Sequence, residues 1–420
     1  MNIFEELEWR GLLQDVSDRQ AMEKLPSGQS FYVGFDPTAS SLHFGNLLQI
    51  TTATRLAKFG YKPVMLFGGA TGSIGDPSGK RSERPLLSRE QINANVAKHT
   101  ATVQNIMARA GASASYVNNL DWTHEVSILD FLRDVGKHFT VNYMLSKDSV
   151  SQRISSEVGI SFTEFSYMLL QAWDFYHLYE KYGVKIQFGG SDQWGNITAG
   201  LELIRKKCGG EAYAFSLPLI LDSQGKKLGK SESGAIWLDA SLLSPFKFHQ
   251  YCLNISDVDA PKLLRSFTFL TREEILNLEE SAKSAPEKRI MQKALADSMC
   301  EFVHGKEALE SAQRCAQVLF GGSLEGLSEG DLLDIFSDAP STTISRSEIE
   351  TTTLFDLFHR SGLAKSKGEA RRLVDSGGAY LNNERITDGA VLLNATIAKE
   401  RNIVVIRSGK KQYQIVQIKD

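Results

Sequence analysis

Two short polar stretches, widely separated along the chain, have the composition of phosphate-binding loops. The first is Asp36-Pro37-Thr38 followed by His43-Phe44-Gly45-Asn46, between an apolar run (31–35) and a helical pattern (47–59). Where a helix follows a strand through a turn, the free N–H groups of its first turn attract anions, and small residues allow close approach. The second is Lys227-Leu228-Gly229-Lys230-Ser231, which combines lysines with glycine. Together they predict a site that binds phosphate.

Neither stretch is specific by itself. A His-x-Gly-Asn tetrapeptide occurs by chance in long chains, and the lysine loop is not a P-loop because Gln224 stands where that pattern needs its first glycine. A third loop, residues 68–79, is rich in glycine and runs into Lys80, Arg81 and Arg84. Glycine followed by cations fits closure over a phosphate. A solvated surface loop has the same composition.

A long helical pattern at 161–182 brings three polar side chains to one face. Ser161 and Glu164 have capping-box spacing and predict where the helix begins. Tyr167, Gln171 and Asp174 then follow at i, i+4 and i+7. They could be ordinary half-buried polar residues. However, burying Asp174 among apolar neighbours is costly without a partner, and the phenol of a ligand would supply one.

Another predicted strand, 184–188, ends in a polar turn rich in glycine. Gly189 and Gly190 permit close backbone approach, and Asp192 is placed to accept hydrogen bonds from ribose hydroxyl groups. A plain tight turn would need the glycines but gives no reason for Asp192 and Gln193.

The elements around these loops predict an α/β domain with a parallel sheet, followed by two smaller parts. Short apolar runs predict buried strands at 31–35, 63–67 and 184–188, with helices at 91–110 and 161–182 between them. Open parallel sheets bind ligands at the carboxyl ends of their strands, where all these loops fall. From residue 245 to 336 the pattern is helical, with clear helices at 271–285 and 287–302.

The end of the chain predicts a linker and a small α+β domain. Residues 337–353 are rich in Ser, Thr and Pro, as linkers are. Beyond them we expect helices at 354–360 and 367–375 and strands at 379–381 and 402–407.

Composition bounds the class of protein. The chain has 420 residues, 42% of them apolar, which suggests two or three domains. No stretch approaches the roughly 18 apolar residues of a membrane span, and residues 1–19 lack a secretory pattern. The four cysteines are scattered along the chain, which is typical of free thiols in a reducing compartment and not of a disulfide framework or a zinc site. We therefore expect a cytoplasmic protein with no membrane contact and no metal-ligating cluster.

Charge is distributed unevenly. Residues 351–420 hold 12 Lys/Arg against 7 Asp/Glu, a net charge of +5, which leaves −8 for residues 1–350 of a total of −3. A basic tail on an acidic body suggests a module that binds a polyanion, although a solvated charged surface explains the tail equally well.

In this order, the two polar stretches resemble the signatures of class I aminoacyl-tRNA synthetases, and longer runs narrow the resemblance to the bacterial-type tyrosyl-tRNA synthetases. The runs that carry it are 32–38, 68–79, 131–139, 159–168 and 189–204. The resemblance implies a Rossmann-like catalytic domain at 1–225 with a dimer-forming insert around 111–160, and a lysine signature loop and helical anticodon-side domain at 226–336. After the linker at 337–353, it implies an RNA-binding domain of the ribosomal S-four type at 354–420.

Residue roles are likewise implied by the resemblance. The substrate phenol would be bound by Tyr32 and Asp174, its ammonium group by Asp76, Tyr167 and Gln171, and the region of its carboxylate by Gln193. ATP would be contacted by Asp36, Thr38, His43, Gly45, Asn46, Gly190, Asp192 and Lys230. The departing pyrophosphate would be held by Lys80, Arg84, Lys227 and Lys230. Thr38, His43 and these four cations would form the catalytic set. In the tail, Lys365, Lys367, Arg371 and Arg372 would contact RNA phosphates.

The implied reaction activates tyrosine and transfers it to tRNA(Tyr). The tyrosine carboxylate, already ionised, attacks the α-phosphate of ATP, so no side chain need act as nucleophile or base. Mg²⁺ is expected with ATP, no permanently bound cofactor is expected, and a homodimer is implied. The family pattern usually has histidine where Asn46 stands, which puts that residue's share of ATP binding in question. Gly229 is typical of the tyrosyl branch.

Two rival interpretations remain at the level of sequence. A tryptophanyl-tRNA synthetase shares the fold and signatures, but the pair Tyr32 and Asp174 suits a phenol better than an indole. A non-catalytic RNA-binding protein derived from a synthetase would not need to keep the lysines together with Asp76, Gln171 and Asp174.

Overall fold

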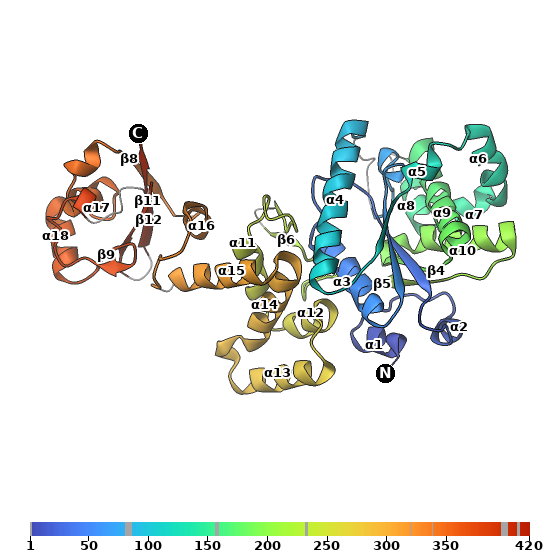
Figure 1. Cartoon of the computed structure of the whole chain (residues 1–420), viewed down its shortest axis with the longest axis horizontal. Coiled ribbons are helices and arrows are strands. Elements are labelled where there is room, and N and C mark those ends of the chain that lie inside the picture. The colour runs from blue at the N-terminus through green and yellow to red at the C-terminus, as the bar shows by residue number, and fades with distance from the viewer. Residues whose placement is uncertain are drawn as a thin grey trace. The chain divides into compact units, whose positions relative to one another are not determined.

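The structure, a computed structural model, describes residues 2–79, 86–155, 159–231, 234–319, 321–337, 339–395, 402–409 and 412–420. The chain folds into two compact units (Figure 1). The first comprises residues 1–243 and 252–303, and the second comprises 244–251 and 304–420. Two of the predicted cationic site residues, Lys80 and Arg84, lie outside the described residues.

A five-stranded parallel sheet forms the centre of the first unit, with the strand order β3-β2-β1-β4-β5. Its strands are β1 (Ser30–Phe35), β2 (Lys62–Phe67), β3 (Ser115–Asn118), β4 (Val184–Gly190) and β5 (Tyr213–Leu217). The parallel sheet and its three predicted strands are confirmed. The edge strand β3 is only half-buried and has no continuous apolar run, so the hydrophobic pattern did not reveal it.

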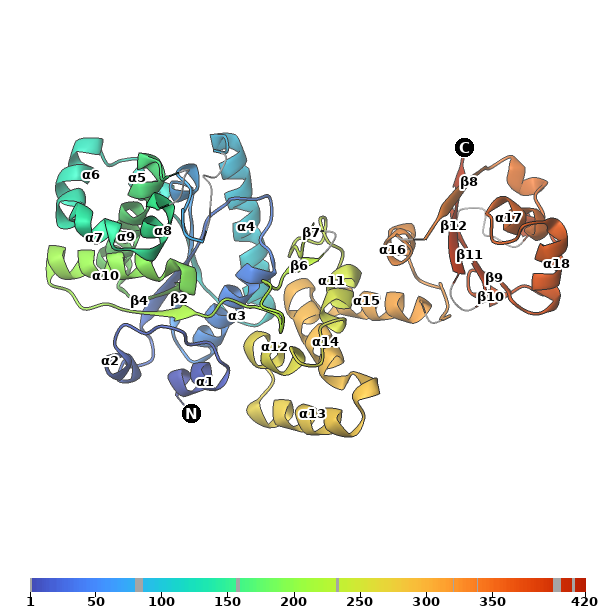
Figure 2. The same cartoon turned by 180° about the vertical axis from the view of Figure 1, so that it is seen from behind.

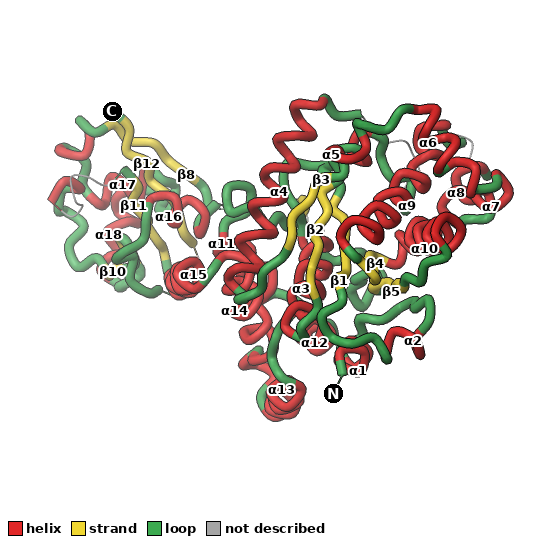
Figure 3. The backbone as a smooth tube through the Cα atoms, turned by 45° about the vertical axis from the view of Figure 1, so that its right-hand side comes forward, coloured by secondary structure: helices red, strands yellow, loops and turns green. Residues whose placement is uncertain are grey.

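Helices cover both faces of this sheet: α3 and α4 lie on one face, and α9 and α10 on the other (Figures 2 and 3). The α-helices up to residue 208 are α1 (Ile3–Trp9), α2 (Arg19–Glu23), α3 (Phe44–Lys58), α4 (Arg89–Arg109), α5 (Leu120–Thr123), α6 (Ile128–Asp134), α7 (Val141–Leu145), α8 (Asp148–Ile154), α9 (Phe162–Tyr182) and α10 (Trp194–Cys208). A short antiparallel pair follows, β6 (Lys230–Ser231) with β7 (Gly234–Ala235).

The helical segment predicted as one domain is divided between the two units. Helices α12 (Ala260–Phe267), α13 (Arg272–Ser284) and α14 (Ile290–His304) belong to the first unit except for the last residue of α14. Most of α11 (Pro245–Leu253), together with α15 (Lys306–Val318) and α16 (Glu329–Ile335), belongs to the second. Periodicity predicts helices well, but it does not show which core each apolar stripe joins.

The second unit contains a mixed sheet of five strands in the order β10-β9-β11-β12-β8. From residue 339 onward, the strands and α-helices of this unit are β8 (Ser341–Ser345), α17 (Leu354–Arg360), α18 (Lys367–Asp375), β9 (Ala379–Leu381), β10 (Glu384–Arg385), β11 (Ile403–Ser408) and β12 (Gln412–Lys419). Both helices of the predicted tail have the predicted bounds.

The predicted linker at 337–353 is wrong in part, because β8 lies within it and pairs parallel with β12. Ile344 is 1% exposed and joins the core of this unit. Ser and Thr suggested a linker, yet β-branched Thr342, Thr343 and Ile344 also suit a short edge strand.

Capping residues set the ends of the long helix α9. The Ser161 side chain accepts a hydrogen bond from the backbone N–H of Glu164 at 3.2 Å, as the capping-box spacing predicted. The carboxylate of Glu164 instead pairs with Arg153, with both side chains buried (Nη2 to Oε2, 2.7 Å). Gly183 ends the helix in the left-handed conformation. The polar face of α9 is therefore fixed at its start by α8.

No helix among the described residues is both long and apolar enough to cross a membrane.

A buried ionic cluster ties α1 to the core of the first unit. The Glu6 carboxylate accepts a hydrogen bond from Arg10 Nε and lies 3.9 Å from Arg55 Nη1. The side chains of all three residues are at most 7% exposed. Both guanidinium groups also donate to the carbonyl oxygen of Thr268 (3.1 and 2.9 Å), and burial lowers the pKa of Arg55 to about 9.

Replacing Glu6 with glutamine should lower the free energy of unfolding by about 3–5 kcal/mol, because two buried cations lose their only close carboxylate within the described cluster. Chemical denaturation at neutral pH measures this. The matched control is Glu8→Gln, because Glu8 pairs with Arg19 where both side chains are about half exposed, and such pairs contribute little. Equal losses in the two variants would contradict the prediction.

Candidate active site

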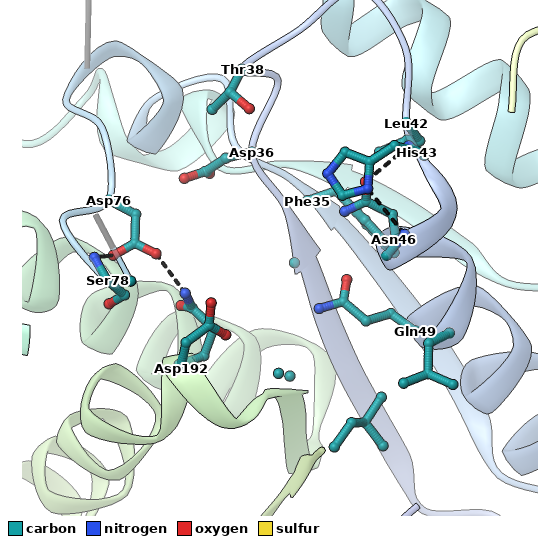
Figure 4. Close-up of a pocket in the computed structure, with 18 of the residues that line it drawn as sticks. Phe35, Asp36, Thr38, Leu42, His43, Asn46, Gln49, Asp76, Ser78 and Asp192 are labelled. Atoms are coloured by element: carbon teal, nitrogen blue, oxygen red, sulfur yellow. Dashed lines mark hydrogen bonds between the residues drawn. The ribbon is translucent and has the colours of Figure 1, made fainter. Parts of the chain in front are cut away.

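A cavity of about 420 Å³ lies at the carboxyl ends of β1, β2 and β4 in the first unit. This is where the strand order reverses, between β1 and β4, the usual position of ligand sites in open parallel sheets. Figure 4 shows His43, Asn46 and Gln49 on one side of it and Asp76, Ser78 and Asp192 on the other. The predicted site residues that line the cavity are Tyr32, Asp36, Thr38, His43, Gly45, Asn46, Asp76, Tyr167, Gln171, Asp174, Gly190, Asp192, Gln193 and Lys227.

Asp174, on α9, is the buried acid of the cavity, at 2% exposed. Asn119 Nδ2 donates to its Oδ2 and Trp122 Nε1 donates to its Oδ1, each at 2.9 Å. The chain itself therefore supplies two donors to this carboxyl, in addition to the ligand phenol that the sequence suggested as a partner. Burial nevertheless raises the pKa of Asp174 to about 7, against the two hydrogen bonds that lower it. Each oxygen keeps a lone pair that can accept a ligand hydroxyl.

The hydroxyl of Tyr32 has no partner within the described residues. Tyr32 lies on β1, is 1% exposed, and packs its ring against Phe175 at a centroid distance of 5.3 Å. Burial first, and then the charge of Asp174, raise the pKa of Tyr32 well above its ordinary value, so it stays a neutral hydroxyl. A buried hydroxyl without a partner is costly. Tyr32 and Asp174 can together bind the hydroxyl of a ligand.

A second cluster of acids lies along the same cavity. Tyr167 donates its hydroxyl to Asp36 Oδ2 at 2.6 Å, and Thr71 donates to Asp36 Oδ1 at 2.7 Å. Asp76 accepts from Gln193 Nε2 at 2.5 Å. Because carboxylate and phenol oxygens are acceptors, this region suits an ammonium group.

Gly68 lets the turn after β2 approach the turn after β1. A Cβ atom on Gly68 would lie 2.0 Å from Asp36 Oδ1 and 2.3 Å from Thr71 Oγ1. Any side chain here would break the hydrogen bond between Asp36 and Thr71. The glycine-rich loop therefore contributes close packing around Asp36, in addition to the phosphate closure predicted for its cations.

The other end of the cavity is the start of α3. His43 Nδ1 accepts from the N–H of Gly45 at 3.0 Å, and the N–H of His43 donates to Asn46 Oδ1 at 3.1 Å. The two side chains thus cap α3 reciprocally. Since the amide oxygen of Asn46 serves the cap, its Nδ2 group remains available to donate to a ligand, and the positive end of the helix dipole adds to the attraction for phosphate.

The lysine loop is brought to this helix by backbone pairing. The N–H of Phe44 donates to Ile236 O at 2.8 Å, and that of Leu238 donates to Leu42 O at 2.9 Å. Lys227 is exposed and lines the cavity. Lys230 begins β6. The structure does not describe the side chain of Lys230, and it does not describe Lys80 or Arg84.

The predicted RNA-binding residues lie on and beside α18 in the second unit. Lys365, Lys367, Arg371 and Arg372 are all exposed. Lys367 forms an ion pair with Asp356 of α17, and Arg371 lies 5.5 Å from the ring centroid of Phe355. Part of this positive charge is thus balanced within the unit, whereas Lys365 and Arg372 project from the same helical region.

Sequence reasoning missed the residues that orient the ligand-binding side chains. Asn119 also donates to Thr71 Oγ1 at 2.9 Å, which links Asp174 to Asp36 through a chain of hydrogen bonds. Gln187, on β4 beside Tyr32, is 3% exposed and lines the cavity, and its Oε1 has no hydrogen-bond partner among the residues that the structure describes. Asn118 is the last residue of β3, and Asn119 follows it directly. That signal would have revealed them, had β3 been recognised.

Comparison with known families agrees with this geometry. Residues 27–321 match the family described as tRNA synthetases class I (W and Y), and residues 331–416 match the family described as Tyrosine--tRNA ligase SYY-like C-terminal domain. Together the two matches cover most of each unit.

Similar proteins match along the full chain. One from Roseiflexus castenholzii, named Tyrosine--tRNA ligase, is 49% identical and covers 99% of each chain. One of the same name from Geobacillus kaustophilus is 46% identical and covers 99% of this chain and 100% of its own. Among solved structures, a C-terminally truncated mitochondrial tyrosyl-tRNA synthetase from Aspergillus nidulans has a TM-score of 0.70 and 30% identity, covering 76% of this chain and 94% of its own.

Proposed function

This chain belongs to the tyrosine–tRNA ligases of the class I tRNA synthetases, and from that premise we propose how its residues divide the reaction. The family's enzymes join tyrosine to tRNA at the expense of ATP. The observation that carries our assignment is the cavity itself. One part of it has a buried acceptor and a hydroxyl without a partner in the described part of the chain, and another part has the positive start of a helix.

In this proposal tyrosine binds with its phenol between Tyr32 and Asp174. The phenol hydroxyl donates to the Asp174 carboxylate and accepts from the Tyr32 hydroxyl, which satisfies both buried groups. Its ammonium group donates to Asp76 and to the phenolic oxygen of Tyr167, with Gln171 beside them. Gln193, held by Asp76, lies toward the substrate carboxylate. A tryptophan side chain would leave Tyr32 and Asp174 without this match, which supports the tyrosine assignment over the tryptophanyl alternative.

ATP then binds toward the start of α3. Its phosphates meet Thr38, His43, Gly45 and Asn46, and its ribose donates to Asp192 beside Gly190. The tyrosine carboxylate attacks the α-phosphate, a bond forms between them, and pyrophosphate departs. Because the nucleophile is already charged, the chain contributes position and electrostatic stabilisation. The cations Lys227 and Lys230, with Lys80 and Arg84, stabilise the departing pyrophosphate. Mg²⁺ belongs to this proposal as the companion ion of ATP, with phosphate and water as its natural ligands.

ATP–pyrophosphate exchange with each of the twenty amino acids supplied singly tests this proposal. Exchange with tyrosine alone is the expected result. Exchange with tryptophan would overturn the roles of Tyr32 and Asp174. A folded protein that binds tRNA but gives no exchange would favour the non-catalytic alternative.

Tyrosine activation should weaken as the pH falls through about 7. The pKa of Asp174 is raised to about 7, so the carboxyl is ionised above that pH and protonated below it. Protonation removes the negative charge that accepts the phenol hydroxyl. We expect kcat/KM for tyrosine to fall about tenfold for each pH unit on the acid side, and Asp174→Asn to abolish this limb. A flat wild-type profile between about pH 5.5 and 8.5 would contradict the prediction.

We extend the proposal to a homodimer formed through the insert. Helices α6 and α7 expose large apolar side chains: Ile128 and Leu129 are each 75% exposed, and Val141 is 60% exposed. Monomeric proteins rarely leave such patches open. The family resemblance of this insert points to a second copy of the chain as the occupant.

Leu129→Glu should convert the dimer to a monomer, because a charge would be buried in an apolar interface. Light scattering after gel filtration measures the molar mass. Leu276→Glu is the matched control, since Leu276 is 45% exposed on α13, outside the insert, and should leave the mass unchanged. A wild-type chain that elutes as a monomer would refute the dimer.

The second unit completes the proposal as the tRNA-binding part. Lys365, Lys367, Arg371 and Arg372 would contact phosphates of tRNA(Tyr) and position it, with no base reading required. The affinity of the protein for tRNA should fall strongly as the salt concentration rises. A cytoplasmic location, predicted from the sequence, fits this role.

A further inference from the structure

The inner face of α4 carries two polar side chains where it passes the turn between β1 and α3. Ile92, His99, Val103 and Ile106 are buried on this helix, and Asn95 falls on the same face by helical spacing. His99 is 1% exposed and lines the cavity. An apolar side chain would pack here at lower cost, because a buried imidazole needs hydrogen-bond partners. The polar pair therefore calls for an explanation beyond packing.

Both side chains bind backbone carbonyl groups of the turn. Asn95 Nδ2 donates to Pro37 O at 3.0 Å, and His99 Nε2 lies 2.9 Å from Ala39 O. These carbonyls belong to the residues on either side of Thr38. The N–H of Thr38 donates to Asp36 O at 2.9 Å, and Asp36 is itself held by Thr71 and Tyr167. The backbone is thus fixed on both sides of Thr38, whose exposed side chain lines the cavity next to Asp36 (Figure 4).

The state of the His99 ring follows from its surroundings. Burial lowers the pKa of His99 to about 4, so the ring is neutral near pH 7. A neutral ring that bonds a carbonyl oxygen through Nε2 must carry its proton there. Nδ1 has no partner among the described residues. His99 thus acts as a neutral hydrogen-bond donor to the turn.

We propose that His99 and Asn95 are positioning residues for tyrosine activation, which hold the carbonyl groups flanking Thr38 so that the Thr38 hydroxyl faces the triphosphate of ATP. This rests on the proposed function, in which Thr38 contacts ATP. In this proposal the two side chains act through the turn.

The first test is His99→Leu, which removes the donor but keeps much of the volume. In ATP–pyrophosphate exchange, we expect kcat/KM for ATP to fall about tenfold, the effect of one hydrogen bond. The KM for tyrosine and the thermal unfolding midpoint should stay unchanged. His99→Gln, which restores an N–H donor, should recover part of the loss. Asn95→Leu, at a half-buried position, should show the same pattern and provides a second variant if His99→Leu does not fold.

A double-mutant cycle separates positioning from general structure. If His99 acts through Thr38, then His99→Leu should cost nothing further in a Thr38→Ala background. The same tenfold loss in that background, or a rise in the KM for tyrosine, would overturn the inference. So would His99→Leu with wild-type kinetics in an enzyme that exchanges normally. A wild-type chain with no tyrosine-dependent exchange would overturn the proposed function and this inference together.

Discussion

Asp174→Asn will lower kcat/KM for tyrosine by about 10²- to 10³-fold while the KM for ATP stays within a factor of about two. The wild-type carboxylate accepts hydrogen bonds from Asn119 and Trp122 and, in our proposal, from the substrate phenol. An asparagine has one acceptor oxygen in place of two. Its N–H₂ group would face the N–H donor of either Asn119 or Trp122. The substitution therefore removes the negative charge and replaces one of the two existing hydrogen bonds with a repulsive contact between two donors. Steady-state ATP–pyrophosphate exchange with varied tyrosine measures the effect.

The control for this variant lies on the same helix. Glu180→Gln also replaces a carboxylate with an amide, but Glu180 is exposed on α9, so we expect wild-type kinetics. The fold of Asp174→Asn should be intact, because removing a buried charge with a raised pKa relieves a desolvation cost. Unchanged adenylate formation in a folded Asp174→Asn enzyme would refute the assignment of Asp174 to the phenol.

Helical spacing was enough to predict that Tyr167, Gln171 and Asp174 share a face, because those positions depend only on the geometry of one helix. It could not predict their partners. Asn119 and Trp122 reach Asp174 from the segment after β3. β3 is a half-buried edge strand whose sequence has no clear hydrophobic pattern. Partners of this kind are set by strand order, which a single sequence does not reveal.

The same limit explains the errors outside the site. β8 is stabilised by pairing with β12, whose first residue lies far along the chain, so composition alone suggested a linker. Local signals such as the Ser161 cap and the bounds of α17 and α18 needed no such partner, and these were predicted correctly. The sequence predicted most helices and strands, but it did not predict which distant segments pair with one another.

Gly229→Ala should reduce the rate of tyrosine activation by about 10²-fold, because it separates the two signature segments. Gly229 has a φ of +93°, and a Cβ atom on it would lie 2.8 Å from the Cβ of Phe44. Phe44 cannot yield easily: it is 1% exposed, and its ring packs on Phe267 at 4.8 Å. The lysine loop must therefore move away from the start of α3. Rapid-quench measurement of adenylate formation would show the loss, while equilibrium dialysis should show unchanged tyrosine binding.

Gly225→Ala isolates the contact from the backbone cost. Gly225 lies two residues before the lysine loop and also has a positive φ, +78°, but no atom of the described residues lies within 4 Å of a Cβ placed there. Both variants meet the cost of about 1 kcal/mol for an alanine in the left-handed region, and only Gly229→Ala adds the clash with Phe44. We therefore expect Gly225→Ala to activate tyrosine within about threefold of wild type. Equal losses of tyrosine activation in the two variants would contradict the prediction. They would show that the backbone conformation of the loop sets the rate, and that the close contact between Gly229 and Phe44 does not.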